Sequence, residues 1–531
     1  MVLPGTYHMS EDSCLTYTGW DLPYMVLRGY GSERPVITGL KSEPIQGWVH
    51  MGLDYWEAPW PHNFGFMANP DSMLCGEDGF EGWIGCLLEH FHPSLDNQLW
   101  RDGRTILRRE MLFQNGERLR QVGNMEALWL RANSFTVPMH GPGMVRIKTN
   151  DNPNDVPVYM ADCEQLLAVR NSRGVELHNL EFTQGNPFIK TGMVEITNTP
   201  QVTIRDCEFS YSNAVGLYVS RAPCYPIDPY DPDSWVVMEE KRAPWNTIDN
   251  VYAHHCGIYG LFVAHAQAFS VTNLRLERNN WRGYEAGTVA YDAGATKFFR
   301  TRHMVIDNLL SQFNFGHGLW FDKDGRDLIV RNSRMQFNSY RGIFVERSFG
   351  PVLIEHCVMT QNTRDMDDDR IYRFRSSALG MSACDTMVVR NTQLLSQRGY
   401  PVLIHSIDYV MEDGIMEPYS DTLYTQAWNN RYQDCTFSRP NGDDFYFFYF
   451  GVAPQMSRCY YMYHTELEHN TWIVDGQEIP KYFVISESNR RCQPIYDGFE
   501  YDLRKWYDTP WDDDPPEGEQ YKRRRHGGGG P

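Results

Sequence analysis

Short apolar segments with a polar residue at one fixed place recur along most of this chain, and they restrict its possible folds more than any other feature. The polar residues stand at Asn179, Asp206, Asn250, Asn273, Asn308, Asn332, His356, Asn391 and Asp434. The intervals between them are 27, 44, 23, 35, 24, 24, 35 and 43 residues. A base interval of 23–27 residues with occasional longer ones indicates one structural unit per repeat, with insertions that emerge as loops.

Each repeat has the pattern of β-strands. Apolar and polar residues alternate, β-branched residues are common, and Gly and Asn occupy the breaks between apolar segments. The sequence therefore predicts an all-β fold, a parallel β-helix in which each repeat is one rung of a solenoid. We expect the polar residue of each repeat to lie at a corner and to hydrogen-bond its equivalents on neighbouring rungs. Three cysteines at the next position, Cys207, Cys357 and Cys435, suit an interior stack.

Two strand-like segments, GLWFD and GIFVE, are spelled alike, and each ends in a carboxylate. These carboxylates, Asp322 and Glu346, lie 24 residues apart, which is the local repeat length, and each follows its repeat position by 14 residues. The two acids therefore belong to one column on neighbouring rungs, which lie ~4.8 Å apart in such a stack. Retaining glycosidases hold their two carboxyl groups ~5–5.5 Å apart, so the predicted spacing fits that chemistry. The alternative is a pair of solvated acids on an exposed strand face.

The repeat is interrupted once, which divides the chain into regions. Residues 1–47 are expected to form the first rungs, and residues 159–440 carry the counted repeats. Residues 48–158 lack the repeat, are rich in Trp and Gly, and include an Asn115-Gly116 dipeptide that favours a tight hairpin. We interpret this region as a small β-barrel or sandwich domain inserted into the solenoid.

Three insertions and the C-terminal part complete the layout. Insertions at 222–244, 281–299 and 362–383 are long enough to form walls around a pocket, and the last two flank the rungs of the acid pair. Residues 441–508 are rich in Tyr and Phe and are predicted to cap the solenoid. Residues 509–531 are charged and rich in Gly and Pro, which predicts a disordered tail.

Composition restricts the partners. The net charge of −19 argues against a nucleic acid partner, because phosphate binding needs a basic surface. It also fits polyanionic substrates poorly, although a local basic cleft stays open. Aromatic residues make up 14% of the chain, and exposed aromatic rings suit sugar rings, so a carbohydrate partner is favoured. The 12 cysteines show no paired metal-binding spacing, and neither a metal nor another cofactor is predicted.

The sequence does not define a compartment, because the basic run KRRRH at 522–526 is compatible with an address signal but is more typical of a solvated tail. No apolar run approaches the ~20 residues that span a bilayer, so no membrane association is expected. The chain begins with MVLPGTY, which has the pattern of a strand and a turn rather than of a signal peptide. Loss of a signal through truncation would be consistent with a secreted or periplasmic protein. The compartment and the oligomeric state stay open.

The stretch EAGTVAY…GHGLWFD…GIFVERSFGP, residues 285–351, resembles the core of glycoside hydrolase family 120, a β-xylosidase family. More loosely, residues 1–440 resemble other β-helix proteins of the same layout. The resemblance implies a right-handed parallel β-helix with an inserted β-barrel domain. It also implies that Asp322 is the nucleophile and Glu346 the general acid/base of a retaining hydrolase, and that Glu285 binds sugar hydroxyls.

The resemblance has departures that leave the sugar open. Ala290, Tyr291 and Asp292 stand where the family has basic and His residues, so a substrate other than a xyloside is compatible with the sequence. Trp320, at an even offset from the nucleophile, is predicted to share its face and to line the pocket. Tyr291 and His317 complete the candidate substrate-binding residues, although the odd offset of His317 favours a structural role.

Two rival functions stay open. A polysaccharide lyase or epimerase acting on uronic acid glycans would use Lys323 or Arg347 as the base, with Ca²⁺ bound by the acidic run DMDDD, 365–369. Strand alternation, however, predicts that the side chains of Lys323 and Arg347 point away from the acids. The second rival is a non-catalytic solenoid that binds carbohydrate.

Overall fold

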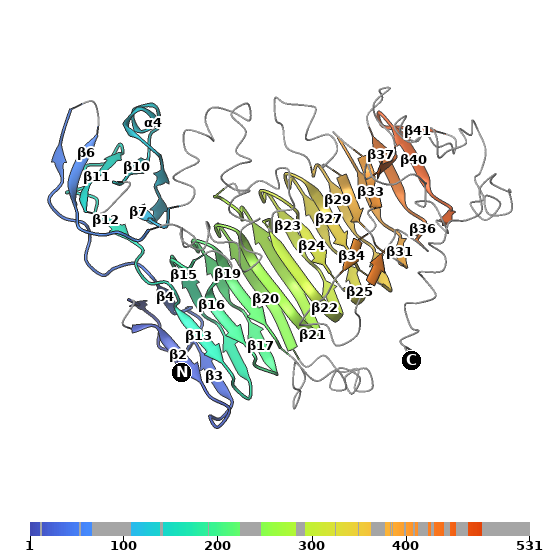
Figure 1. Cartoon of the computed structure of the whole chain (residues 1–531), viewed down its shortest axis with the longest axis horizontal. Coiled ribbons are helices and arrows are strands. Elements are labelled where there is room, and N and C mark those ends of the chain that lie inside the picture. Colours follow the sequence, from blue (N-terminus) through green and yellow to red (C-terminus); the bar gives the residue numbers. More distant parts are fainter. Residues whose placement is uncertain are drawn as a thin grey trace.

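The structure, a computed structural model, describes most of the chain (Figure 1). The described residues are 1–10, 13–52, 55–65, 108–138, 142–188, 191–222, 246–282, 293–323, 325–348, 350–362, 377–382, 384, 386–397, 400–406, 409–411, 423–425, 430–439, 447–452 and 466–479. Strands dominate this part of the chain, and its one α-helix is α4 (Met125–Leu130).

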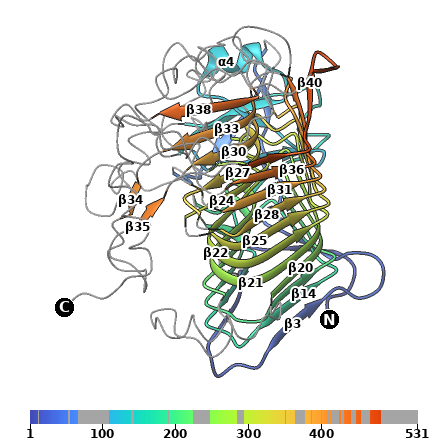
Figure 2. The ribbon, with the colours of Figure 1, turned by 90° about the vertical axis from the view of Figure 1, so that its right-hand side faces the viewer.

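Three strand columns form the faces of a solenoid, called A, B and C in the order in which each rung visits them (Figures 1 and 2). Face A contains β2 (Leu15–Thr18), β13 (Leu167–Arg170), β16 (Gly192–Thr197), β19 (Val215–Ser220), the first parts of β21 (Tyr259–Glu277) and β22 (Thr296–Asp307), β24 (Leu319–Asp322), β27 (Arg341–Glu346), β30 (Ser377–Ser382), β33 (Tyr400–Ser406) and β38 (Phe448–Val452). Face B contains β3 (Met25–Arg28), β14 (Val175–His178), β17 (Val202–Arg205), the start of β20 (Asn246–His254), later parts of β21 and β22, β25 (Arg326–Arg331), β28 (Val352–Glu355), β31 (Met387–Arg390), β36 (Arg431–Gln433) and β39 (Glu466–Glu468). Face C contains β1 (Thr6–His8), β4 (Val36–Thr38), β15 (Glu181–Thr183), β18 (Glu208–Ser210), the ends of β20 and β21, β23 (Leu310–Gln312), β26 (Arg334–Gln336), β29 (Val358–Thr360), β32 (Gln393–Leu395), β37 (Thr436–Arg439) and β40 (Thr471–Val474).

Equivalent strands on successive rungs pair in parallel, which gives the parallel β-helix predicted from the repeat. For example, β24 pairs with β27, β25 with β28, and β26 with β29. The interior of the solenoid is one continuous apolar core to which every face contributes. The three cysteines predicted to lie inside, Cys207, Cys357 and Cys435, are buried and have free thiols.

The repeated polar residue lies at the corner between faces B and C, where the backbone adopts a left-handed conformation. All nine predicted positions have φ between 49° and 58°, the left-handed region that Asn and Asp tolerate better than most residues. The predicted hydrogen bonds between equivalent corners form at some rungs, such as Asn308 Nδ2 to Asn273 Oδ1 at 2.8 Å. At others the corner amide bonds to the preceding strand instead, as from Asn332 Nδ2 to Asp307 Oδ1 at 2.8 Å.

A second polar ladder, which the sequence analysis missed, lies buried at the corner between faces C and A. Its members are Asn279, Asn314, Asn338 and Asn362. Each of the first three donates its side-chain Nδ2 to the Oδ1 of the next, at 3.1, 2.9 and 2.9 Å. The ladder explains why GLWFD and GIFVE both begin with glycine. A Cβ at Gly318 would lie 2.7 Å from Asn338 Nδ2, and one at Gly342 would lie 2.8 Å from Asn362 Nδ2.

The two ends of the solenoid lie on either side of the counted repeats. At the N-terminal end β2, β3 and β4 pair with β13, β14 and β15, so the chain resumes the same stack after residue 158. At the other end β38 pairs with β33, and β40 pairs with β37. The solenoid therefore continues beyond 440, and the predicted boundary there is too early. After β40, β41 (Gln477–Ile479) turns back to pair with it in antiparallel fashion. The predicted tail, 509–531, lies outside the described residues.

Between β4 and β13 the described chain forms two small sheets. One contains β5 (Val49–His50), β6 (Trp56–Trp60), β11 (Gly143–Lys148), β10 (Ser134–Thr136) and β9 (Arg120–Gln121), and the other contains β12 (Val158–Met160), β7 (Leu112–Gln114) and β8 (Glu117–Arg118). Their strands enclose a separate apolar core that includes Trp60 and Phe135. The predicted hairpin at Asn115-Gly116 is confirmed, because both residues have positive φ and β7 pairs with β8. A further hairpin joins β34 (Tyr409–Met411) to β35 (Leu423–Thr425).

Candidate functional site

The two predicted acids stand opposite each other at the ends of adjacent strands of face A. In the pairing of β24 with β27, Trp320 is the register partner of Phe344 and Asp322 is the partner of Glu346. Leu319 and Phe321 alternate with these residues and belong to the interior core. Trp320 therefore shares the outward side of β24 with Asp322, which agrees with the alternation expected from the sequence.

This outward side is shielded from water around the acids. Asp322 is 6% exposed, Glu346 5%, Trp320 1% and Phe344 6%. A buried carboxylate is costly unless it is paired or protonated. The alternative of two solvated acids is incompatible with this burial, and the two carboxyl groups must be stabilised by their surroundings.

Asp322 is stabilised by a lysine that the sequence analysis did not select. Lys297, on β22, is the register partner of Trp320 on the preceding rung and is 1% exposed. Its Nζ lies 2.7 Å from Asp322 Oδ2 and 3.7 Å from the centroid of the Trp320 ring, so the cation is held by a carboxylate and an aromatic face. The other oxygen, Oδ1, has no hydrogen-bond partner among the described residues. The lone cation within the segment ATKFF is the available signal. The predicted insertion at 281–299 covers this segment and is too long, because β22 begins at Thr296.

Glu346 has the opposite environment. Burial, followed by the charge of Asp322, raises the pKa of Glu346 to about 7, while Arg347 and Lys297 act in the other direction. Arg347 Nη2 lies 3.5 Å from Glu346 Oε1. At neutral pH a large fraction of Glu346 is therefore protonated, next to a carboxylate that is held in an ion pair.

The prediction that Lys323 and Arg347 point away from the acids is wrong. Arg347 contacts Glu346, and Lys323 Nζ lies 5.8 Å from the ring centroid of Phe299, the register partner of Asp322. Both residues have positive φ, 53° for Lys323 and 49° for Arg347. The alternation of a strand ends where the backbone enters the left-handed region, so the side chain after each acid turns toward the acid's side.

Aromatic rings pack around His317 beside the acids. The His317 ring lies 5.0 Å from Trp320, 5.7 Å from Tyr340 and 4.9 Å from Phe344 between centroids. His317 is 3% exposed, and burial, followed by the charges of Arg341 and Lys297, holds its pKa well below the usual value. The imidazole is therefore neutral. Among the described residues, neither His317 Nδ1 nor Trp320 Nε1 has a hydrogen-bond partner.

Other predicted site residues lie outside the described part of the chain. These are Glu285, Tyr291 and the acidic run 365–369. His405 follows the acids in the same strand column, two rungs beyond Glu346, with Ser382 between them. The described residues contain no group of three His, Cys, Asp or Glu side chains able to hold a metal ion, and no helix long and apolar enough to span a membrane.

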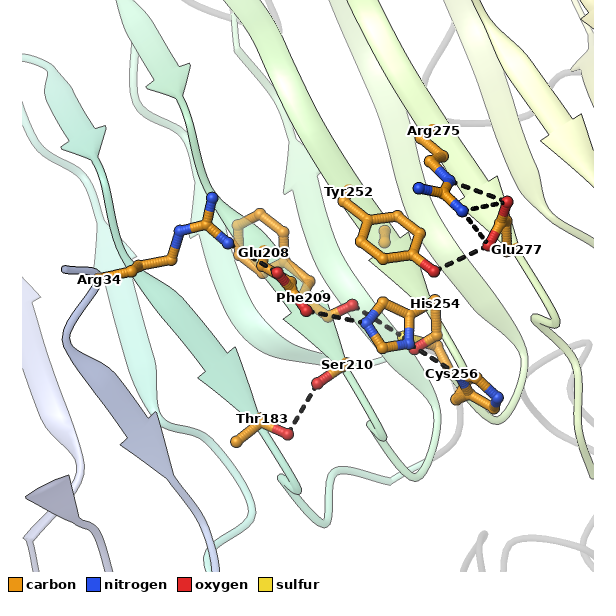
Figure 3. A network of polar contacts seen from close by, with 12 residues as sticks. Arg34, Thr183, Glu208, Phe209, Ser210, Tyr252, His254, Cys256, Arg275 and Glu277 are labelled. Atoms are coloured by element: carbon orange, nitrogen blue, oxygen red, sulfur yellow. Dashed lines mark hydrogen bonds and ion pairs between the residues drawn. The ribbon is translucent and has the colours of Figure 1, made fainter. Parts of the chain in front are cut away.

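A separate polar network lies on face C (Figure 3), whereas the two acids lie on face A. Glu208 accepts a hydrogen bond from Arg34 at 2.6 Å and interacts with His254 Nε2 at 3.0 Å, and the contact with His254 lowers the pKa of Glu208. On the same face, Glu277 accepts hydrogen bonds from Tyr252 at 2.8 Å and from Arg275 at 2.8 Å. Each carboxylate is held by its neighbours, which is the pattern of a structural network that ties successive rungs together.

Comparison with known proteins identifies the class of fold. A family model described as a right-handed β-helix region matches residues 192–393, which include both acids. Among solved structures, the chain is similar to that of XylC in complex with xylose, at 13% identity and a TM-score of 0.54, over 83% of this chain and 72% of that one. This likeness is one of fold, and the right-handed parallel β-helix expected from the sequence is confirmed.

Two other solved structures are more distant. One is a glycoside hydrolase, at 10% identity and a TM-score of 0.43, over 88% of each chain. The other is the periplasmic alginate epimerase AlgG, at 12% identity and a TM-score of 0.34, over 58% of this chain and 70% of that one. No curated protein matches the chain.

Proposed function

We propose that the protein is a retaining glycoside hydrolase in which Asp322 is the nucleophile and Glu346 is the general acid/base. The observation that carries this proposal is the opposite environment of two acids on adjacent rungs. Lys297 pairs with Asp322 at 2.7 Å, whereas burial raises the pKa of Glu346 to about 7. A retaining hydrolase needs a protonated carboxyl group as the acid and an ionised carboxylate as the nucleophile at the same bond. Different surroundings of the two carboxyl groups provide this difference.

The chemistry follows in two steps. In the first, Asp322 Oδ1 attacks the anomeric carbon while protonated Glu346 donates its proton to the glycosidic oxygen, so that the carbon–oxygen bond breaks and a glycosyl ester forms. In the second, Glu346 takes a proton from water, the water oxygen attacks the anomeric carbon, and the ester bond to Asp322 breaks. Lys297 stabilises the carboxylate of Asp322 before the attack and again when it leaves.

The polar atoms next to the acids suit a sugar. His317 Nδ1 and Trp320 Nε1 are buried and lack partners among the described residues, and buried polar atoms of this kind are satisfied by a ligand or by water. Glu285 joins them in the proposal through the resemblance to glycoside hydrolase family 120, and Tyr291 joins them as a candidate at a position where the sequence departs from that family. Because XylC, whose fold is similar, was solved with xylose, a β-xyloside belongs among the first substrates to assay.

A panel of aryl glycosides in both anomers tests the proposal. The panel covers xylose, arabinose, fucose, galactose, glucose and glucuronate. Asp322→Ala should abolish turnover, and azide should restore part of it as a glycosyl azide of the opposite anomer. Glu346→Ala should lose least with good leaving groups, and azide should give the same anomer as the substrate. Wild-type rates in both variants would exclude the assignment of these two residues. No turnover of any glycoside by the wild type, with glycan binding kept in the Asp322→Ala, Glu346→Ala double variant, would leave a binding solenoid as the better description.

A lyase or epimerase acting on uronic acid glycans is the second candidate. The observation that favours it is the presence of Lys297, Lys323 and Arg347 on the acids' side of face A. That chemistry needs a basic side chain to remove the proton next to a sugar carboxylate. Ultraviolet absorbance from an unsaturated product, or inversion at C5 without cleavage, would favour this candidate over hydrolysis.

A further inference from the structure

An arginine on an aromatic ring accompanies the proposed general acid, as Lys297 accompanies the proposed nucleophile. Lys297 Nζ lies 3.7 Å from the ring centroid of Trp320, which stands two positions before the nucleophile in β24. The guanidinium carbon of Arg341 lies 4.0 Å from the ring centroid of Phe344, which stands two positions before the general acid in β27. Residues two apart in a strand share a side, so both rings hold their cation on the side of the sheet where the acids stand.

The side chain of Arg341 is buried, and a glycine on the next rung makes room for it. Arg341 is 7% exposed. Its strand, β27, pairs with β30, where Gly380 is the register partner of Phe344. A Cβ at Gly380 would overlap Arg341 Cδ and lie 2.5 Å from Arg341 Nε, so the arginine occupies the space that any other residue would fill there. The glycine therefore lets Arg341 cross onto the neighbouring rung and lie against the Phe344 ring.

The protonation of Glu346 depends on neighbours that act in opposite directions. Burial, followed by the charge of Asp322, raises the pKa of Glu346. The described residues whose charges lower this pKa are Arg347, Lys297 and Arg341. On the following rung, β30 places an uncharged residue, Ser382, opposite Glu346. The charge state of Asp322 therefore helps to decide whether Glu346 is protonated.

The charge of Asp322 changes between the two steps of the proposed reaction. In the first step Glu346 gives its proton to the glycosidic oxygen and Asp322 becomes a neutral ester, so the negative charge beside Glu346 disappears. In the second step Glu346 must be a carboxylate, because it takes the proton of the attacking water while the ester bond to Asp322 breaks. A buried carboxylate without cations nearby favours its protonated form. Fixed cations around Glu346 keep it ionised until the water attacks.

We propose that Arg341 is a positioning residue of the general acid/base, and that its guanidinium, held across the glycine on the Phe344 ring, keeps Glu346 ionised in the glycosyl-enzyme. This role rests on the proposed function, because it concerns the second step of that reaction. Arg341 acts through Glu346 and not on the sugar, so its charge is the property that the reaction requires. The other two cations act in the same direction, so loss of Arg341 alone should change the pH dependence of the reaction without abolishing turnover.

The pH dependence of the two steps tests this proposal. Arg341→Met removes the charge and keeps an apolar side chain against Phe344. The substrate is the 2,4-dinitrophenyl glycoside of the sugar that the aryl glycoside panel identifies, because its good leaving group makes the second step rate-limiting. The acid limb of kcat should move upward by about half a pH unit to one pH unit, which lowers kcat about threefold to tenfold on that limb and leaves its plateau unchanged. The basic limb of kcat/KM, which reports the protonated acid of the first step, should also move upward.

Matched variants separate the charge of Arg341 from its packing. Arg341→Lys keeps a cation and should return both limbs toward their wild-type positions. Gly380→Ala, whose Cβ displaces the arginine, should move the limbs in the same direction as Arg341→Met. Ser377→Ala, at the register partner of Arg341 on β30, should move neither limb. Wild-type limbs in Arg341→Met, or equal shifts in Arg341→Met and Arg341→Lys, would overturn the proposal.

A measurement without substrate separates this inference from the proposed function. The Tm of Arg341→Met and that of the Arg341→Met, Glu346→Gln double variant are compared from pH 4 to 9. The folded state binds the Glu346 proton more tightly than the unfolded state, so the Tm difference grows with pH until the folded carboxyl group has ionised. Without Arg341 the difference should level off about half a pH unit to one pH unit higher than between wild type and Glu346→Gln. This shift without hydrolysis of any glycoside would keep the effect of Arg341 on Glu346 and overturn the hydrolase, whereas hydrolysis without any shift would keep the hydrolase and overturn the role of Arg341.

Discussion

Replacing Glu346 with glutamine should make the protein more stable at high pH, at the expense of activity. The carboxyl group is buried beside Asp322, and its pKa is about 7 in the folded protein against 4.5 for an unperturbed glutamate. In the unfolded chain the group ionises at the lower pH. Between these two values the folded state binds more protons than the unfolded state, so raising the pH destabilises the fold.

The magnitude follows from the two pKa values. A tenfold change in acidity corresponds to 1.36 kcal/mol, so the difference between 4.5 and about 7 amounts to about 3 kcal/mol. The stabilisation is fully present below pH 4.5 and is lost as the pH rises to about 7. Glu346→Gln removes the ionisation, so its stability relative to wild type should rise by up to about 3 kcal/mol over this range. For 531 residues the unfolding entropy is about 1.1 kcal/mol/K, which converts this figure to about 3 °C in Tm.

Calorimetric Tm values of both proteins at a series of pH values between 4 and 8 provide the assay. The difference in Tm should be smallest near pH 4 and should grow until about pH 7, where it levels off. Glu478→Gln, at an exposed position of β41, serves as the control and should show no such trend. A Tm difference for Glu346→Gln that is constant across the series would refute the burial argument.

Three further predictions concern the same region. Lys297→Gln leaves Asp322 buried without its cation, so we expect a loss of about 3–5 kcal/mol in the free energy of unfolding, measured by chemical denaturation. The Lys297→Gln, Asp322→Asn double variant should recover part of this loss in the same measurement. Because Glu346 must be protonated in the first step, the kcat/KM for aryl glycosides should fall above about pH 7, and a rate that keeps rising to pH 9 would contradict its role as the acid. Asn338→Leu interrupts the buried ladder between Asn314 and Asn362 and should cost about 1–3 kcal/mol per unsatisfied partner in the same denaturation experiment.

The spacing of residues within strands could be predicted from the sequence, because the period of a strand and the length of a repeat define the register. The repeat alone placed Asp322 and Glu346 opposite each other, and the even offset placed Trp320 on their side. The two-residue period of a strand did not predict the direction of side chains at positions where the chain leaves a strand. Lys323 and Arg347 turned toward the acids because the corner backbone is left-handed.

Tertiary structure alone decided the chemistry of the pair. Lys297 reaches Asp322 from a different rung, across an interval in which the 14-residue offset does not hold, so spacing did not reveal it. The burial that raises the pKa of Glu346 depends on the packing of the whole face, which no local pattern encodes. The sequence by itself determined a solenoid with two acids in one column. Which acid has its pKa raised by burial, and which is paired with a lysine, was decided by neighbours that are distant along the chain, because electrostatic environment depends on proximity in space.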